Sequence, residues 1–499
     1  MTRNQAARRR AAQGFGWGVV GGAALVALMY YAGAFLGLRT LSQLLSGPLL
    51  SLMPGPVFGF LIDTLQHAGK VVEELCLIVA MVVGLGGLGA LSSIAGLRFR
   101  SPYLPFAFAA IGWLVVCALL LPITGVGFLG LGDGLPTPLI WAALFAIYAV
   151  VLQYGEQPPR GVDLERRRLL SAVPVSIAAI SVGALALRLV PDWFQAIFAA
   201  PESGVRGISP AVTPVGNFYV VSKNFSDPKV AAQGWSLHVG GLVDRPMSLN
   251  LGDLRALPST QEYVTLECVS NNVGGDLMST GLFTGVRLRE LIAGASPHAG
   301  ATWVSFKARD GYTESLPLSL VEGAPEILVA YDLDGAPLPQ AHGFPARILI
   351  PGHYGMKGPK WLESIELATS ELRGYWEQQG WDHNAVVKTT ARFDEPRDGD
   401  IVRLGRISVG GVAFAGTRGI GKVEFTTDGS RWSGADFDAP LSPLTWVVWR
   451  ATWTPESEGA YRLMVRAIDA GGAIQDAHTA PSYPNGASGY HTIQVSVSK

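Results

Sequence analysis

The stretch TLECVSNNVGG, residues 265–275, decides how the rest of the chain is interpreted. It holds Cys268 near the end of an alternating, strand-like segment, followed by two glycines that allow a tight turn and close backbone approach to a ligand. The other cysteines, Cys76 and Cys117, lie within apolar runs, so Cys268 has no partner for an intradomain disulfide. The chain also has no C-x-x-C pair. Cys268 is therefore a structural residue, a nucleophile or a metal ligand.

A second informative stretch, residues 332–367, gathers Gly, Pro, His, Arg and Lys on connections between short strands. It reads DLDGAPLPQAHGFPARILIPGHYGMKGPKWLESIEL. Arg347 and Lys360 are suitable anchors for a phosphate, and nearby glycines free backbone N–H groups for an anion. A soft thiolate and an anion-binding loop together suggest a metal held by an organic, phosphorylated cofactor. The alternatives are a core histidine at His342 and surface charges at Arg347 and Lys360.

Charge is distributed unevenly along the chain. Hydrophobic residues make up 49% of the 499 positions and charged residues 15%, well below the roughly 25% of an average soluble domain. Residues 1–200 hold 13 Lys and Arg and 8 Asp and Glu, whereas residues 201–499 hold 25 and 31. The first part is predicted to be a membrane domain and the second to be soluble. The formal net charge of −1 gives no basic face for nucleic acid.

The N-terminal part contains apolar runs long enough to cross a bilayer. We expect five spans, near 16–38, 70–96, 103–126, 135–154 and 170–190. A sixth run, 45–62, is broken by three prolines and is expected to be re-entrant or interfacial. Glu73 and Glu74 begin one span and are expected at the membrane interface rather than on a proton path.

Basic residues set the expected orientation of these spans. They lie before the first span, in the loop between the second and third spans, and in the loop between the fourth and fifth. These three segments are therefore expected in the cytoplasm, and five spans put residues 191–499 outside it. The segment ERRRLLSAVPVSIAAISVGALALRL before the last span is also similar to a twin-arginine export signal, although its arginines equally suit ordinary positive-inside charge.

The soluble part divides into two domains. Residues 201–385 contain short alternating segments between Gly, Pro and Asp turns, which predicts a β-rich α+β domain. Residues 386–499 alternate with turn signals every ten or so residues, which predicts an immunoglobulin-like sandwich that packs or dimerises. Four tryptophans in this last domain are expected in its core or an interface: Trp432, Trp446, Trp449 and Trp453.

Residues 210–499 resemble the sulfite oxidase family of molybdopterin-dependent oxidoreductases, in its membrane-anchored bacterial branch. The TLECVSN segment is similar to the family's cysteine motif, HGFPARILIPG followed by KW to its cofactor signature, and DGYTESLP to its active-site tyrosine segment. GIGKVEFTTDGSRW, WR and RAID are similar to the family's C-terminal dimerisation domain. Together with the apolar runs, the resemblance predicts three parts: a five-helix membrane domain over 1–200, an α+β molybdopterin domain over 201–385 and an immunoglobulin-like dimerisation domain over 386–499.

The resemblance also implies roles for individual residues. Cys268 would ligate molybdenum through its thiolate, and Tyr312 would lie near the reacting oxygen as a hydrogen-bond donor. Cofactor-binding positions would be Asn217, Phe218, Tyr219, Cys268, Asn271, His342, Arg347, Gly358, Pro359 and Lys360. For Tyr312 a packing role is the alternative, and His238, His353 and Lys223 are further candidates to line the pocket. One molybdenum–molybdopterin per chain is expected, with no haem and no iron–sulfur cluster, because no ligand set for either is evident.

The departures from the family pattern bear on substrate. Sulfite-oxidising members carry an arginine shortly after the ligand cysteine, whereas this chain reads CVSNNVGG, with Val273 near that place. We therefore expect oxygen-atom transfer on a small neutral S- or N-oxide, with electrons exchanged with an external carrier or the quinone pool. The alternatives are a sulfite dehydrogenase, with cations such as Arg373 or Arg392 folded over the site, and a non-catalytic binding protein with a degenerate oxidoreductase domain. The expected location is the cytoplasmic membrane, with the catalytic domain outside the cytoplasm and a homodimer formed through the C-terminal domain.

Overall fold

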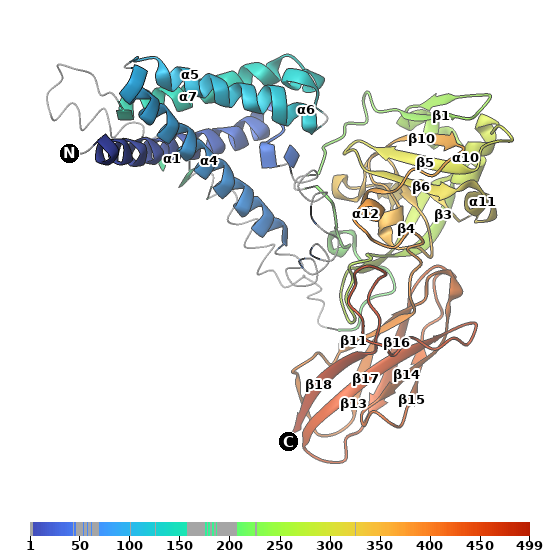
Figure 1. The fold of residues 1–499 in the computed structure, drawn as a ribbon. Helices are drawn as coiled ribbons and strands as arrows, with labels where there is room; N and C mark the ends of the chain where they lie inside the picture. Colours follow the sequence, from blue (N-terminus) through green and yellow to red (C-terminus); the bar gives the residue numbers. More distant parts are fainter. Residues whose placement is uncertain are drawn as a thin grey trace. The chain divides into compact units, whose positions relative to one another are not determined.

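The structure is a computed structural model that describes residues 3–45, 69–99, 101–156 and 207–499 (Figure 1). Within these ranges the structure does not describe residues 43, 125, 225, 226 and 325. Between the ranges it describes a few isolated positions. The chain forms two compact units, one mainly N-terminal and helical and the other containing residues 227–499.

The helical unit contains four helices that are long and apolar enough to cross a membrane, over Ala7–Gly33, Val71–Phe99, Leu104–Ile123 and Pro136–Gly155. They belong to α1 (Arg3–Leu36), α4 (Gly69–Phe99), α5 (Leu104–Leu114) with its continuation to Ile123, and α7 (Pro136–Glu156). Four of the five predicted spans are therefore present as helices. The fifth, the twin-arginine-like segment and the 45–62 run lie almost entirely outside the described residues.

Glycines allow α1 and α4 to pack closely. A Cβ on Gly18 would lie 2.7 Å from the Leu85 carbonyl oxygen, and Cβ atoms on Gly14 or Gly89 would overlap the facing helix. Small residues at four-residue spacing let two helix backbones approach, which is how helices associate where lipid removes the hydrophobic drive between them. Gly14 faces residues 89–93, whereas Tyr30 bonds Glu74, so the two helices run antiparallel.

The central domain contains two five-stranded sheets. The first has the order β2 (Met247–Leu249), β1 (Leu237–Gly241), β10 (Leu362–Ala368), β5 (Trp303–Ala308) and β6 (Thr313–Pro317). The second runs β3 (Thr260–Glu267), β4 (Met278–Arg287), β7 (Leu328–Leu333) and β8 (Ala336–Pro337), with β9 (Arg347–Leu349) also paired to β7. Short helices α9 (Leu251–Ala256), α10 (Leu288–Ala295), α11 (Leu318–Gly323) and α12 (Tyr375–Gln378) complete the predicted α+β character.

The apolar core of this domain explains the alternation seen in its sequence. Leu237, Val239, Val304, Phe306 and Ile365 come from β1, β5 and β10 and are wholly buried in one cluster. Successive strand residues point to opposite faces, so every second residue of these segments reaches this core.

The C-terminal domain is β-rich, as predicted. Eight strands are linked in the order β11-β13-β16-β15-β14-β17-β18-β12 (Figure 1). Their bounds are β11 (Thr390–Glu395), β12 (Ile401–Arg403), β13 (Ile407–Phe414), β14 (Ile420–Thr426), β15 (Ser433–Phe437), β16 (Val447–Trp453), β17 (Gly459–Asp469) and β18 (His491–Ser498). Trp446, Trp449 and Trp453 are buried, as expected of core or interface residues, whereas Trp432 is half-buried and packs edge-on against Tyr490. The immunoglobulin-like topology stays a prediction.

Candidate active site

Cys268 is the first residue after β3, in a loop that returns to β4 at Met278. The neck of the loop is closed by a hydrogen bond from the Cys268 amide to the Leu277 carbonyl at 2.9 Å. Inside the loop, the Asn271 side chain donates to Glu267 Oε1 at 3.0 Å and accepts from the Leu277 amide at 3.0 Å. The loop that carries the cysteine is thus braced by backbone and side-chain bonds, and Asn271 is one of its braces.

The Cys268 thiol lies in a buried, polar environment. Its Sγ is 3.0 Å from Ser270 Oγ. Burial raises the pKa of the thiol, while the Ser270 hydrogen bonds and the positive charge of Lys360 oppose that rise. A metal ion deprotonates a coordinating thiol outright, so a raised pKa in the metal-free chain is compatible with a ligand role.

The predicted cofactor-binding residues His342, Arg347 and Lys360 converge around Gly343. This glycine follows the short helix η5 (Gln340–His342) and has φ +108°, a region that L-residues with side chains rarely adopt. A Cβ on Gly343 would lie 3.0 Å from Lys360 Cβ and 3.1 Å from Arg347 Cβ. Lys360 Nζ donates to the carbonyls of Ala341 and Val221, at 2.8 and 3.1 Å. The glycine therefore lets two cationic side chains pack beside one turn.

Arg347 is a buried guanidinium, 6% exposed, which excludes the surface-charge alternative. Its Nη1 donates to the His342 carbonyl at 3.3 Å, and among the described residues its Nε has no acceptor and the group has no carboxylate partner. Burial lowers its pKa to about 10, although Tyr219 acts against that shift. Burying an unpaired charge is costly. An anion at this position would satisfy both the charge and the free donor, so Arg347 fits a bound phosphate.

Other predicted residues surround this cationic pair. His342 is buried against Phe218, with ring centroids 5.3 Å apart, and burial followed by repulsion from Arg347 and Lys360 lowers its pKa to about 4. Tyr219 stacks on Phe218, and a Cβ on Gly355 would lie 2.9 Å from its hydroxyl. Asn217 is exposed at the end of the short helix η4 (Val215–Asn217).

Gly358 and Pro359 lie against β9. The Ile348 amide donates to the Pro359 carbonyl at 3.0 Å, and a Cβ on Gly358 would lie 2.6 Å from the Ile348 carbonyl oxygen. They connect β9 to Lys360. The weaker candidates have partners of their own: His238 pairs with Glu366 at 3.8 Å, His353 bonds the Pro351 carbonyl at 3.4 Å, and Lys223 bonds Asn224 at 3.1 Å.

Tyr312 is buried, and its hydroxyl donates to the Met356 carbonyl at 2.5 Å. Burial, followed by the negative charge of Glu314, raises its pKa well above the usual value. The hydroxyl therefore carries its proton, and that proton is directed to the helical turn η6 (Gly355–Lys357). The sequence predicts a Tyr312 hydroxyl that donates to a reacting oxygen, but in the structure it donates to the Met356 carbonyl instead.

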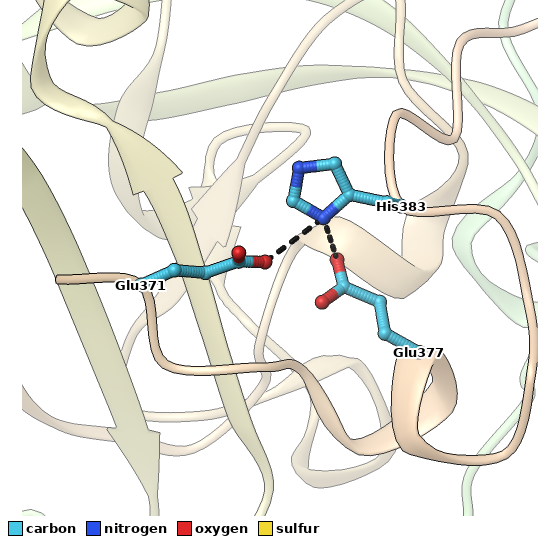
Figure 2. A group of neighbouring side chains, drawn as sticks. All are labelled: Glu371, Glu377 and His383. Carbon is cyan, nitrogen blue, oxygen red and sulfur yellow. Dashed lines mark ion pairs between the residues drawn. The ribbon is translucent and has the colours of Figure 1, made fainter.

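A buried ion network holds the same turn in place. Lys357 Nζ lies 2.7 Å from Glu314 Oε1 and 2.6 Å from Glu377 Oε1. Figure 2 shows His383 Nδ1 facing Glu377 and Glu371, at 3.5 and 3.0 Å. The three ligand atoms of Glu371, Glu377 and His383 are close enough to one another for a metal ion. However, Lys357 already supplies Glu377 with positive charge, so we assign the group as an ion network that joins η6 to α12.

The C-terminal domain also contacts the cysteine loop. Arg392, from β11, donates to the Gly275 carbonyl at 2.6 Å and pairs with Asp394 at 2.8 Å. Gly274 has φ +78° and lies against His491, where a Cβ would overlap the imidazole ring. Arg392 is therefore committed to the back of the loop, whereas Arg373 is exposed. The sequence did not predict the contacts of Arg392 and His491 with this loop. The paired glycines Gly274 and Gly275 were the one signal in the sequence for close packing at this turn.

Comparisons with known proteins agree with this arrangement. A family model described as an oxidoreductase molybdopterin binding domain matches residues 224–376. The uncharacterized oxidoreductase YuiH of Bacillus subtilis is 35% identical over 161 residues, which cover 78% of that protein and 32% of this chain. The chain belongs to the sulfite oxidase family of molybdopterin-binding oxidoreductases.

Sulfite oxidase family members from eukaryotes match a longer region. Human mitochondrial sulfite oxidase is 28% identical over 302 residues, covering 51% of this chain and 55% of that protein, so the match spans about half of the human protein. The sulfite oxidase of Arabidopsis thaliana is 28% identical over 274 residues, covering 45% of this chain and 69% of that protein. The chain is thus an oxidoreductase enzyme of sulfite oxidase type, which removes the non-catalytic alternative.

A solved structure of the family type supports the fold. The sulfane dehydrogenase SoxCD from Paracoccus pantotrophus superposes with a TM-score of 0.52 at 19% identity, over 58% of this chain and 82% of that one. The molybdopterin cofactor of the family fits the residues present here. A buried thiol, an uncompensated buried guanidinium and a half-buried lysine match a soft metal joined to a phosphate.

Proposed function

We propose that this chain is a membrane-anchored molybdenum-cofactor oxidoreductase that transfers an oxygen atom to or from a small substrate. The observation that carries the proposal is the buried Arg347 guanidinium, which has no carboxylate partner among the described residues. It lies beside Lys360, whose positive charge acts on the Cys268 thiol. When bound, the cofactor supplies two-electron oxygen-atom chemistry, and the protein supplies binding, orientation and electrostatics.

The residues of the chain would divide these tasks. Cys268 holds molybdenum through its thiolate. Arg347 and Lys360 hold the cofactor phosphate, as charge-assisted donors do. The remaining cofactor contacts are proposed for Asn217, Phe218, Tyr219, Asn271, His342, Gly358 and Pro359. In the cofactor-free chain His342 is buried and its pKa is lowered to about 4, so its imidazole is neutral at neutral pH before the cofactor binds.

Tyr312 is proposed to hydrogen-bond with the reacting oxygen of the substrate. The Tyr312 hydroxyl donates to the Met356 carbonyl, so toward a substrate it can act only as an acceptor in this arrangement. Rotation of its O–H bond away from Met356 would let it donate to the substrate oxygen. The Lys357 network fixes the turn that offers this competing acceptor, and so it influences how readily Tyr312 donates.

A neutral S- or N-oxide is the proposed substrate class. The cysteine loop carries Val273 where sulfite-oxidising relatives carry an arginine, and Arg392 is held by Asp394 and the Gly275 carbonyl. A charged hydrogen bond is worth roughly 1.5–3 kcal/mol, so a dianion would lose about tenfold or more in affinity for each one missing. Sulfite dehydrogenase activity is the second candidate, favoured by the similarity to named sulfite oxidases.

Steady-state kinetics would separate these candidates. We expect a higher kcat/KM for reducing a neutral sulfoxide or N-oxide with a dithionite-reduced dye than for oxidising sulfite with an artificial acceptor. The opposite ranking, with micromolar affinity for sulfite, would establish the dehydrogenase. Cys268→Ser should abolish both activities while leaving the fold intact, because a hard hydroxyl is a poor replacement for a thiolate ligand, with Cys76→Ser as the matched control. Full turnover by Cys268→Ser would refute the ligand assignment.

We also propose a membrane topology, a role for the C-terminal domain and an electron carrier. We place the catalytic domain, residues 201–385, outside the cytoplasm, anchored by five spans within 1–200. Four of those spans are supported by helices of sufficient length and apolarity. Residues 386–499 would be an immunoglobulin-like module that also supports a homodimer. Electrons would be exchanged with an external carrier or the quinone pool, and the cofactor set would contain neither haem nor an iron–sulfur cluster.

A further inference from the structure

The ion network around Lys357 runs from the protein surface to a wholly buried carboxyl group. At its outer end the His383 side chain is 48% exposed, and its Nδ1 lies 3.0 Å from Glu371 and 3.5 Å from Glu377 Oε1 (Figure 2). Glu377 Oε1 lies 2.6 Å from Lys357 Nζ. At the inner end Lys357 Nζ lies 2.7 Å from Glu314 Oε1, and the Glu314 side chain is 0% exposed. Each of these groups can bind and release a proton, so the network is a row of proton-exchanging groups that leads inward.

The inner end of the network holds one proton more than its ion pairs need. One ammonium group faces two carboxyl groups, so the trio is neutral only when one carboxyl group is protonated. Burial opposes the ionisation of Glu377, but hydrogen bonds from Lys357 and from the Gly374 amide at 2.9 Å outweigh it and lower the pKa of Glu377. Burial raises the pKa of Glu314 to about 8; Lys357 opposes this rise and the charge of Glu377 adds to it. Glu314 therefore carries the proton at neutral pH.

This proton lies beside the turn that Tyr312 contacts. Tyr312 and Glu314 are two residues apart on one extended segment, so their side chains leave the same face. They bond adjacent residues of η6, the carbonyl of Met356 and the ammonium group of Lys357. Glu314 Oε2 is buried and has no hydrogen-bond partner among the described residues, and a Cβ on Gly374 would overlap it. A buried oxygen without a partner is where a bridging water binds.

We propose that this network, from His383 to Glu314, is a proton relay that exchanges protons between solvent and Tyr312. The inference rests on the proposed function, because oxygen-atom transfer at Tyr312 is what consumes or releases protons. Reduction of a sulfoxide breaks the S–O bond, takes two electrons from the external carrier and takes up two protons to give a sulfide and water. Both protons must reach a site enclosed by protein, and a row of ionisable groups provides a path.

The proton moves along this row in defined steps. Tyr312 gives its proton to the departing oxygen, and Glu314 Oε2 replaces it through a bridging water. Lys357 Nζ then protonates the Glu314 carboxylate and regains a proton from His383 through Glu377 Oε1. The exposed His383 ring rotates toward Glu377 to do so and takes its next proton from solvent. The second proton follows the same path, and with a substrate that is oxidised each step runs in reverse.

The first test follows the Glu314 proton directly in the purified full-length protein, without turnover. The infrared band of this carboxyl group is the one lost in Glu314→Gln; it should disappear as the pH rises through about 8 and shift on mixing with D2O. We expect the shift to be about tenfold slower in His383→Ala and to be restored by added imidazole, which replaces the missing proton carrier. His298→Ala is the matched control, because His298 is 46% exposed and also pairs with a carboxylate, Asp244. Exchange at the wild-type rate in His383→Ala, or no carboxyl band lost in Glu314→Gln, would overturn the relay.

The second test measures sulfoxide reduction by the cofactor-loaded protein with a dithionite-reduced dye. We expect Glu314→Gln to lower kcat by about tenfold at an unchanged KM and to enlarge the solvent deuterium isotope effect, since proton delivery becomes slow. His383→Ala changes only the surface end, so it should act in the same direction and recover with imidazole, whereas His298→Ala should match the wild type. Wild-type kcat and isotope effect in both relay variants would overturn the relay. Absence of turnover by the wild type itself would instead refute the proposed function and leave the infrared exchange to decide the relay.

Discussion

At the scale of single residues, the burial of Arg347 is unfavourable unless an anion pairs with its charge. Its guanidinium is 6% exposed and has a donor atom without an acceptor among the described residues. Uncompensated buried charge destabilises a fold by several kcal/mol, so a phosphate bound at Arg347, as proposed, would stabilise the protein as well as hold the cofactor. Cofactor loading would then raise the stability of the central domain.

We predict that Arg347→Gln lowers bound molybdenum and molybdopterin by about tenfold or more, since a charged hydrogen bond is lost. The cofactor-free form of the variant should be no less stable than cofactor-free wild type, because a buried charge has been removed. Metal analysis and thermal unfolding measure the two effects. Arg309→Gln is the control, since Arg309 is 63% exposed and pairs with Glu363. Wild-type cofactor content in Arg347→Gln would contradict the phosphate role.

Sequence reasoning named most of the residues that converge, because they lie in two short motifs. His342, Arg347 and Lys360 fall within 19 consecutive positions, and their meeting needs only the turn at Gly343. The sequence could not show which acceptor the Tyr312 hydroxyl bonds, because that acceptor is the carbonyl of Met356, 44 positions away. Nor could it show that Glu74 is buried, because that burial depends on how α1 packs against α4; its expected position at the membrane interface stays a prediction.

At the scale of elements, the cysteine loop is held from two sides. Asn271 braces it from within, and Arg392 and His491 hold its back from the C-terminal domain. The sequence predicted both domains but not this contact, since residues more than 100 positions apart carry no local signal of meeting. The C-terminal domain therefore shapes the loop that carries Cys268.

A glycine substitution measures this contact. Gly274→Ala must place a side chain at φ +78° and against the His491 ring. Gly234 has the same φ of +78°, and a Cβ added there would meet no atom within 4 Å, so Gly234→Ala reports the backbone cost alone, roughly 1–2 kcal/mol. We expect Gly274→Ala to lose more stability than Gly234→Ala and to make the Cys268 thiol react faster with iodoacetamide in cofactor-free protein. Equal losses, with no change in thiol reactivity, would show that His491 does not restrain the loop.

The pH dependence of stability tests the same interface. His491 accepts a hydrogen bond from the Phe393 amide at 3.0 Å, and burial followed by repulsion from Arg392 lowers its pKa to about 4, although Asp394 and Asp398 oppose this. The unfolded chain takes up this proton near pH 6.5. The stabilisation is therefore complete above about pH 6.5 and is lost as the pH falls through 4.

We predict that the Tm of wild type falls more steeply than that of His491→Gln between about pH 6.5 and 4.5. Glutamine lacks the titration, so the difference between the two curves isolates His491 from the carboxyl groups that titrate in the same range. Circular dichroism of the β-sheet signal follows the transition. Parallel curves would mean that His491 is not held neutral in the folded state.

At the scale of the whole molecule, the chain joins a helical unit to the domains of residues 227–499. Four helices are long and apolar enough to be the first four proposed spans, and basic residues lie before the first, between the second and third, and after the fourth. With the N-terminus in the cytoplasm, an odd number of spans would put residues 201–499 outside it, and an even number would put them inside. The proposed fifth span would therefore determine on which side of the membrane the catalytic domain lies.

Reporter fusions measure this directly. We expect an alkaline phosphatase fused after residue 200 to be active, because that enzyme matures outside the cytoplasm, and a fusion within 157–165 to be inactive. Replacing Arg166 to Arg168 with lysines keeps the positive charge that orients the span but removes an arginine-specific signal. Unchanged export in that variant would assign the segment to ordinary insertion, and lost export would assign it to the twin-arginine route. An inactive reporter after residue 200 would instead place the catalytic domain in the cytoplasm and exclude an extracytoplasmic substrate.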